Sequence, residues 1–105
     1  MDPKTVNSRR DQVQLLDVRE DDEWSAGRID GARHIPLSQV PARLGELDRD
    51  RTVVTVCRSG GRAGRAAEFL SGAGWTAEVM DGGMTSWAQA GLPITTPDGT
   101  PGQVA

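Results

Sequence analysis

The sequence contains one cysteine, one histidine and one phenylalanine among 105 residues, and it has no tyrosine. One cysteine excludes an intramolecular disulfide, a CxxC redox pair and a cysteine-rich zinc site. No apolar run approaches the roughly 20 residues that a membrane-spanning helix requires, and residues 1–12 lack the apolar stretch of a secretory signal. We therefore expect a cytoplasmic protein with no membrane partner.

The net charge of −3 at pH 7 gives no reason to expect nucleic acid as a partner. A length of 105 residues fits one domain with one modest hydrophobic core, and nothing in the sequence demands more than a monomer. The acids of residues 20–23, "EDDE", are too few and too local for a calcium-binding loop. No metal site is predicted.

Short apolar runs alternate with segments of helical pattern along most of the chain. Strands are predicted at 13–19, 52–57 and 75–80, with a short extended piece up to Ile35. Helices are predicted at 20–27, at 38–47 with Ser38 as N-cap, at 62–74 and within 81–94, and residues 1–12 are a loose lead-in or a short helix. This alternation is typical of an α/β fold whose parallel sheet binds ligands at the carboxyl ends of its strands.

The only thiol stands where the strongest predicted strand ends. Cys57 follows the β-branched run "TVVTV" and precedes the loop "RSGGR". Gly60 and Gly61 leave the loop backbone uncovered, so that successive N–H groups can converge on an anion. The N-terminus of the next helix adds its partial positive charge. Together with three nearby arginines, this setting favours the thiolate form of Cys57 over the inert core thiol that a lone cysteine usually is.

Two reactions use an activated thiolate in an anion-binding loop. Phosphoryl transfer through a cysteinyl-phosphate requires a loop that surrounds a tetrahedral phosphate. Sulfur transfer through a cysteine persulfide requires a loop that surrounds one terminal sulfur, and the smaller guest needs the smaller loop. Four residues separate Cys57 from Arg62.

Three stretches resemble single-domain rhodaneses, the rhodanese-like domain family. These are "LLDVREDDEWSAGRIDGARHIPL", "VVTVCRSGGRAGRAAEFLSGAGW" and "VMDGGMTSWAQAGLPI". The resemblance implies a rhodanese-like α/β fold over residues 9–95, with a central five-stranded parallel sheet flanked by helices on both faces. Residues 1–8 are then an N-terminal lead-in, short enough that the first edge strand is expected to be reduced, and residues 96–105 are a flexible C-terminal tail rich in Pro, Gly and Thr.

By the same resemblance, Cys57 is the catalytic cysteine. The loop that would bind the substrate or the persulfide comprises Arg58, Ser59, Gly60, Gly61, Arg62 and Ala63. Sulfur-transferring members resemble C-x4-R, whereas the related dual-specificity phosphatases and arsenate reductases have C-x5-R, so the spacing here fits sulfur. Ala63 stands where a serine often follows the loop arginine, which leaves the turnover rate open.

The resemblance implies an enzyme of the thiosulfate sulfurtransferase type. It would move sulfane sulfur from a small anionic donor such as thiosulfate to cyanide, a low-molecular-weight thiol or an acceptor protein, through a persulfide on Cys57 and with no other cofactor. The alternative is a non-enzymatic persulfide carrier or interaction module with little turnover on small donors.

Several other residues allow two interpretations. Asp17 and Arg19 end the first strand. One interpretation gives them a structural role, as an ion pair or in a bond to loop backbone; the other gives them a role in tuning the reactivity of Cys57. Arg58 either binds an anionic donor or is a solvated charge. Arg62 either closes the loop or braces a carboxylate such as Asp17 or Glu23. His34 is the only histidine, and the resemblance assigns it no role as a catalytic base.

Overall fold

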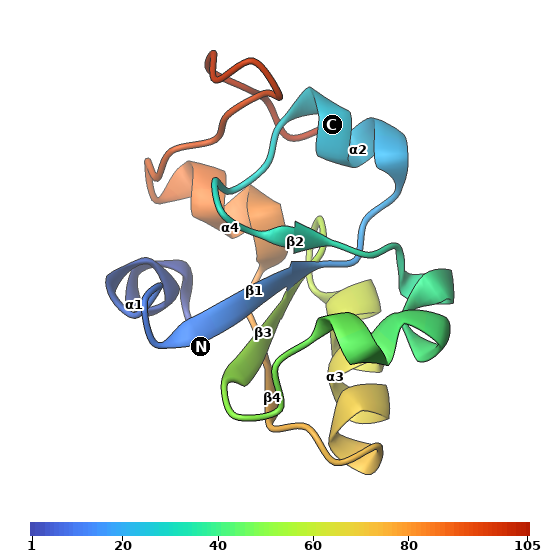
Figure 1. The fold of residues 1–105 in the computed structure, drawn as a ribbon. Coiled ribbons are helices and arrows are strands. Elements are labelled where there is room, and N and C mark those ends of the chain that lie inside the picture. Colours follow the sequence, from blue (N-terminus) through green and yellow to red (C-terminus); the bar gives the residue numbers. More distant parts are fainter.

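Four strands form one parallel sheet in the computed structural model, which describes residues 1–105. The strands are β1 (Val13–Asp17), β2 (Arg33–His34), β3 (Thr52–Val56) and β4 (Ala77–Val79), in the spatial order β2-β1-β3-β4 (Figure 1). The register pairs the whole of β1 with the whole of β3, from Val13 opposite Thr52 to Asp17 opposite Val56. Because the two central strands end at the same level, the residues that follow each of them emerge side by side at one edge of the sheet.

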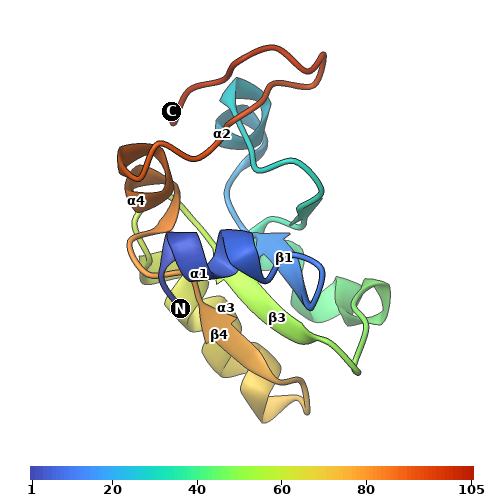
Figure 2. The same ribbon diagram turned by 90° about the vertical axis from the view of Figure 1, so that its left-hand side faces the viewer.

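The helical segments lie on both sides of this sheet. They are α1 (Pro3–Ser8), α2 (Asp21–Ala26), η1 (Leu37–Gln39), η2 (Pro41–Glu46), α3 (Gly61–Gly72) and α4 (Gly83–Gln89), of which η1 and η2 are 3₁₀ helices. α1 and α4 cover one face, α3 and the two 3₁₀ helices cover the other, and α2 lies beyond the carboxyl ends of the strands (Figures 1 and 2). No helix of the structure combines the length and apolar character needed to cross a membrane.

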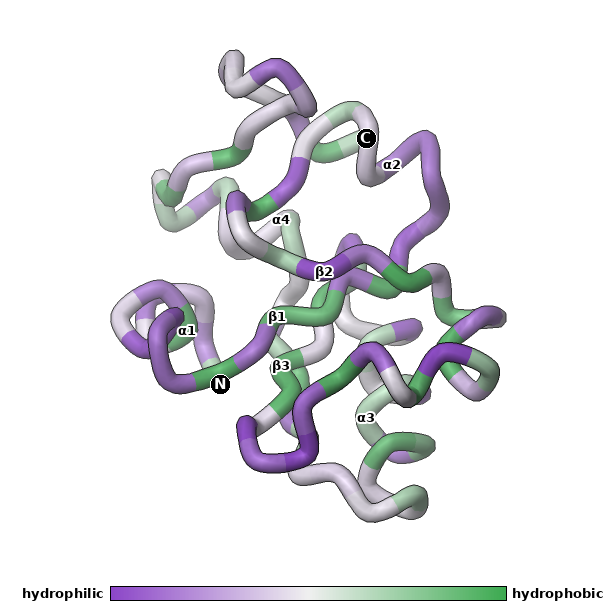
Figure 3. Tube along the Cα trace, in the orientation of Figure 1, coloured by the Kyte–Doolittle hydropathy of each residue, from purple (hydrophilic) through white to green (hydrophobic).

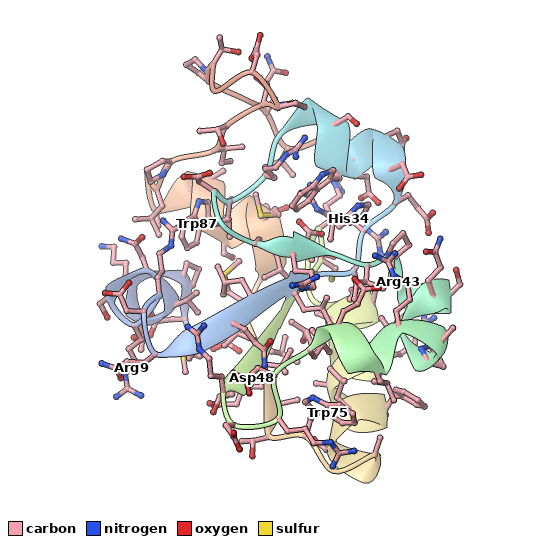
Figure 4. The ribbon with its side chains drawn as sticks, in the orientation of Figure 1. Arg9, His34, Arg43, Asp48, Trp75 and Trp87 are labelled. Atoms are coloured by element: carbon pink, nitrogen blue, oxygen red, sulfur yellow. The ribbon has the colours of Figure 1, made fainter.

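The core is divided by the sheet into two clusters. Neighbouring residues of a strand point to opposite faces, so Val53 packs with Leu70 of α3, whereas Val54 packs with Trp87 of α4. All four side chains are completely buried. Figure 3 shows the apolar colouring concentrated along β1 and β3, and Figure 4 shows Trp87 on the α4 side and Trp75 on the α3 side.

The resemblance implies five strands, whereas the sheet has four. At the outer edge of β4, only Met1 takes the position of a fifth strand: its amino group donates a hydrogen bond to the Val79 carbonyl at 3.0 Å, and the Asp81 N–H donates to the Met1 carbonyl at 2.9 Å. Pro3 then begins α1, with the Asp2 carboxylate accepting the N–H of Thr5 as N-cap. One paired residue is not a strand, so the expected reduction of the first edge strand is confirmed.

The helix predicted at 38–47 is also wrong. Two 3₁₀ helices occupy this stretch, and Ser38 lies inside the first of them rather than at a cap. Arg43 leaves helical geometry at φ −121° and ψ 20°, and Gly45 lowers the helix propensity. The other predicted helices and strands are confirmed to within a few residues.

Residues 95–105 turn back across α2. Thr95 forms isolated antiparallel bridges with Arg28 and with Pro101, and the Gln103 N–H donates to the Ala26 carbonyl at 3.0 Å. The flexibility of residues 96–105, like the domain limits, stays a prediction.

Adjacent residues of α3 test the position of the core. Leu70 is completely buried, whereas Phe69 is 41 % exposed. We expect Leu70→Ala to lower the free energy of unfolding by about 2–5 kcal/mol through the lost burial and the cavity, and Phe69→Ala by about 1 kcal/mol or less. Urea denaturation of both variants measures the difference, and equal losses would contradict the described packing.

Candidate active site

Cys57 follows β3 directly, and its side chain is enclosed by the loop that begins there. The residue is 1 % exposed, and its Sγ accepts a hydrogen bond from the Gly60 N–H at 2.9 Å. Gly60 adopts a φ of +122°, a conformation that costs glycine little and strains other residues. This glycine is also the N-cap of α3. The chain therefore bends around the sulfur and enters the helix within a few residues.

The loop leaves a group of backbone donors without protein acceptors. Apart from Gly60, no residue of the loop donates its N–H to a protein atom; these residues are Arg58, Ser59, Gly61, Arg62 and Ala63. The first turn of a helix has no intrahelical acceptors for its N–H groups, and the loop adds further donors. Such a set of free N–H groups binds anions in many proteins, so the anion-binding loop predicted from the sequence has its donors available.

The N-terminus of α4 holds the other side of this loop. The Met84 N–H donates to the Cys57 carbonyl at 2.8 Å, and the Thr85 N–H donates to the Arg58 carbonyl at 3.0 Å. The backbones approach so closely that a Cβ on Gly83 would lie 2.4 Å from the Cys57 carbonyl oxygen. Because the N–H groups of α4 bind these two carbonyl oxygens, the hydrogen-bond acceptors of Cys57 and Arg58 are directed toward α4. Sequence reasoning missed this contact, although a Gly-Gly pair before a helix was its visible signal.

The side chain of Arg62 is bound to α2. Its Nη1 and Nη2 donate to the two carboxylate oxygens of Glu23 at 2.6 and 2.8 Å. These hydrogen bonds lower the pKa of Glu23 from its ordinary 4.5 to about 2. Glu23 also accepts the N–H of Glu20 in the capping box that begins α2. Of the two interpretations of Arg62, the structure has the brace to a carboxylate, and the partner is Glu23 rather than Asp17.

Asp17 and Arg19 form a buried ion pair beneath α2. The Arg19 Nε and Nη2 donate to the Asp17 carboxylate at 2.9 and 2.8 Å, and both side chains are at most 1 % exposed. The remaining Arg19 donors bind the carbonyls of Glu23 and Gly27, at the two ends of one helical turn. The pair therefore anchors α2, as the structural interpretation predicts. A role in tuning Cys57 stays a prediction.

The contacts of His34 are with Arg19 and α2 rather than with Cys57. Its Nε2 lies 2.7 Å from the Arg19 carbonyl oxygen, and its ring stacks on Trp24 of α2 at 4.7 Å. Figure 4 shows His34 just below α2.

The remaining predicted site residues have different surroundings. Arg58 is exposed, and its Nε donates to the Ala105 carbonyl at 3.0 Å. Ser59 is exposed, whereas the Ala63 methyl is completely buried. The Ala63 carbonyl accepts a hydrogen bond from the hydroxyl of Thr55, a buried polar residue of β3, at 2.8 Å. Sequence reasoning passed over Thr55 as one residue of a strand, yet its hydroxyl ties the first turn of α3 to the sheet.

The largest depression on the surface lies elsewhere. It is lined by residues from the α1–β1 connection and the turn at 30–33, including Arg10, Asp30 and Arg33, near the amino ends of the strands. No residue of the Cys57 loop lines it. A loop that holds one small group by backbone N–H donors does not need a large cavity, so the chemistry and the largest depression are separate features.

Comparison with known proteins adds an independent line of evidence. Residues 2–90 match the family model described as "Rhodanese-like domain". A protein named "Sulfurtransferase" from Allochromatium vinosum is 38 % identical over 90 residues, covering 85 % of this chain and 84 % of that protein. A "Thiosulfate sulfurtransferase GlpE" from Shewanella oneidensis is 33 % identical over 79 residues, covering 74 % and 78 %. The crystal structure of a rhodanese-related protein from Thermoplasma volcanium superposes with a TM-score of 0.86 at 30 % identity, covering 90 % of this chain and 95 % of that one.

The contact between α4 and the Cys57 loop is tested by two glycines. We expect Gly83→Ala to destabilise the protein by about 1–3 kcal/mol, since the new methyl would collide with loop backbone. Gly64→Ala is the control, because a Cβ there meets nothing within 4 Å and alanine favours a helix interior by up to about 1 kcal/mol. Chemical denaturation measures both; a Gly83→Ala variant as stable as the wild type would argue against the close approach.

The Glu23–Arg62 pair predicts a pH dependence. The pKa of Glu23 is lower in the folded state, so the ionised carboxylate stabilises the fold fully above about pH 4.5, and this contribution is lost as pH falls toward 2. We expect Glu23→Gln to lower the free energy of unfolding at pH 7 by about 1–3 kcal/mol. Glutamine retains the capping box, so the difference reports the charge.

The measurement is the denaturation midpoint of both proteins between pH 7 and pH 2. The gap between them should shrink as pH falls below about 4.5 and nearly close at about 2, the folded-state pKa. A gap that stays constant over this range would show that Glu23 contributes nothing through its charge.

Proposed function

The chain belongs to the rhodanese-like domain family, and on that premise we propose that it transfers sulfane sulfur from a small anionic donor such as thiosulfate to a thiophilic acceptor. One observation carries the proposal. The only cysteine lies within a loop whose N–H groups, at Arg58, Ser59, Gly61, Arg62 and Ala63, have no protein acceptor. A persulfide on Cys57 would place its negatively charged outer sulfur where such donors can bind it.

The first step forms the persulfide. The Cys57 thiolate attacks the outer sulfur of thiosulfate, a new S–S bond forms, and the original S–S bond breaks with its electron pair leaving on sulfite. The charge on the thiolate passes to the outer sulfur, so the total charge is unchanged. The Gly60 N–H, which already contacts Sγ at 2.9 Å, and the free N–H groups stabilise this charge without moving, because the loop is held from both sides.

The second step regenerates the Cys57 thiolate. A nucleophile attacks the outer sulfur, and the Cys57 thiolate leaves with the electron pair of the S–S bond. With cyanide the product is thiocyanate; in the cell the acceptor is a low-molecular-weight thiol or an acceptor protein. The chain has no second cysteine, so the acceptor comes from outside it. The covalent persulfide is the carrier, and no further cofactor takes part.

Two features favour sulfur over phosphate as the group transferred. Four residues separate Cys57 from Arg62, which makes a small loop. In addition, both terminal nitrogens of Arg62 bind Glu23, so this guanidinium is not available to grip phosphoryl oxygens in the bidentate manner that arginine uses.

A persulfide carrier with little turnover on small donors is the second candidate. The observation that favours it is burial: Cys57 is 1 % exposed, so a small acceptor has limited access to its sulfur. Ala63, which offers no hydroxyl to an anionic sulfur, points the same way. The two candidates share the persulfide and differ in its rate of discharge.

Intact-mass measurement after incubation with thiosulfate tests the proposal. We expect a mass gain of about 32 Da, one sulfur atom, that cyanide reverses. Cys57→Ser should show neither the gain nor thiocyanate production, because a hydroxyl forms no persulfide. Full thiocyanate production by Cys57→Ser would overturn the mechanism. A stable mass gain with very slow thiocyanate release would favour the carrier.

A further inference from the structure

A segment outside the matched residues reaches the Cys57 loop. Residues 95–105, here named the C-terminal strap, run across α2 (Figures 1 and 2), and the Ala105 backbone oxygen accepts a hydrogen bond from the Arg58 side chain of the loop. The Gln103 N–H donates to the Ala26 carbonyl at 3.0 Å, and the Gly102 N–H donates to the Ile94 carbonyl at 2.9 Å. The family model ends at residue 90, so the strap lies outside the residues that it matches.

The strap is fitted to α2 by two glycines. A Cβ on Gly102 would lie 2.8 Å from the Gly27 Cα and 2.9 Å from the Ala26 carbonyl oxygen, and a Cβ on Gly27 would lie 2.5 Å from the Gln103 carbonyl oxygen. Real Cβ atoms do not approach backbone so closely, so this crossing requires glycine on both segments. Val104 packs against the second core cluster. The docked position is therefore specified by the sequence of both segments.

The strap contacts the second arginine of the loop. Arg62 is paired with Glu23, whereas the Nε of Arg58 donates to the backbone oxygen of Ala105 at 3.0 Å. A guanidinium that is free of this contact can form charge-assisted hydrogen bonds with an anion. While the strap is docked, the Nε of Arg58 is occupied and its side chain is tethered toward the strap.

We propose that the C-terminal strap sets the selectivity of Cys57 for small anionic reagents by holding Arg58. When the strap is displaced, Arg58 is free to bind an incoming anion next to the sulfur; when it is docked, neutral and anionic reagents reach Cys57 on more equal terms. The identification of the anion as a thiosulfate-like sulfur donor rests on the proposed function. The control of Arg58 by the strap does not.

Alkylation of Cys57 measures this selectivity without any sulfur transfer. Iodoacetate is an anion and iodoacetamide is neutral, so the ratio of their rates reports the cation beside the sulfur. We expect Gly102→Val, which displaces the strap, to raise the iodoacetate-to-iodoacetamide ratio about two- to fivefold, the effect of one exposed charge. The rise should disappear at about 1 M salt, where such charges are screened.

Matched variants test whether release of the strap and the charge of Arg58 together cause the rise in the ratio. Gln103→Ala keeps the backbone hydrogen bond and should leave the ratio at the wild-type value. In an Arg58→Ala background, Gly102→Val should no longer raise the ratio, since its target is missing. Gln103→Pro removes the N–H that binds Ala26 and is a second way to release the strap should Gly102→Val fail to fold.

Each outcome decides between the proposals. A ratio unchanged by both release variants, or a rise that persists in the Arg58→Ala background, overturns control by the strap. So do Gly102 and Gln103 amides that exchange in the wild type as fast as an unstructured chain. If the ratio behaves as expected but thiosulfate leaves no sulfur on Cys57, the proposed function fails and control by the strap stands. If sulfur transfer occurs, Gly102→Val should also lower the KM for thiosulfate about two- to fivefold.

Discussion

The contact between the N-terminus of α4 and the Cys57 loop is the constraint on which the site depends. Two N–H groups of α4 bind the carbonyls of Cys57 and Arg58, and Gly83 permits the approach because it has no side chain. A loop of this kind has carbonyls as well as N–H groups, and an anion is repelled by the former. By binding the carbonyls on one side, α4 leaves a loop with a surplus of free donors.

Two ion pairs connect the sheet, α2 and the start of α3. The buried pair of Asp17 and Arg19 anchors α2, α2 presents Glu23, and Glu23 holds Arg62 at the start of α3. Removing one partner of a buried pair leaves an uncompensated charge, at a cost of about 3–5 kcal/mol, so the support resists distortion. Arg19 and Arg62 therefore act as structural braces, and the groups left for an anion are the free N–H groups of the loop and Arg58.

Backbone donors suit a persulfide. A terminal sulfur is small and carries one charge, and several N–H groups can bind it without side-chain motion. The charged side chain left to influence which reagents approach is Arg58, and its Nε lies against the C-terminal strap. The proposed function places the chemistry in the loop of the family domain, and the proposed control by the strap places its selectivity in the segment that follows.

The sequence by itself determined the alternation of strands and helices, the place of Cys57 after a strand, and the loop of glycines and arginines around it, because all of these are local patterns. It also limited the loop to four residues between Cys57 and Arg62. Local patterns failed at 38–47, where Arg43 leaves helical geometry despite the helical spacing. The resemblance failed at the fifth strand, where only Met1 reaches the edge of β4.

Only the tertiary structure decided what the charged residues do. The choice of Glu23 rather than Asp17 as the partner of Arg62, the place of Thr55 under Ala63, and the strap against Arg58 join segments that are distant in the chain. A charge in a sequence shows that a partner is needed, but the partner is chosen by which segments the sheet brings together. That choice depends on packing across the whole fold, which no local pattern contains.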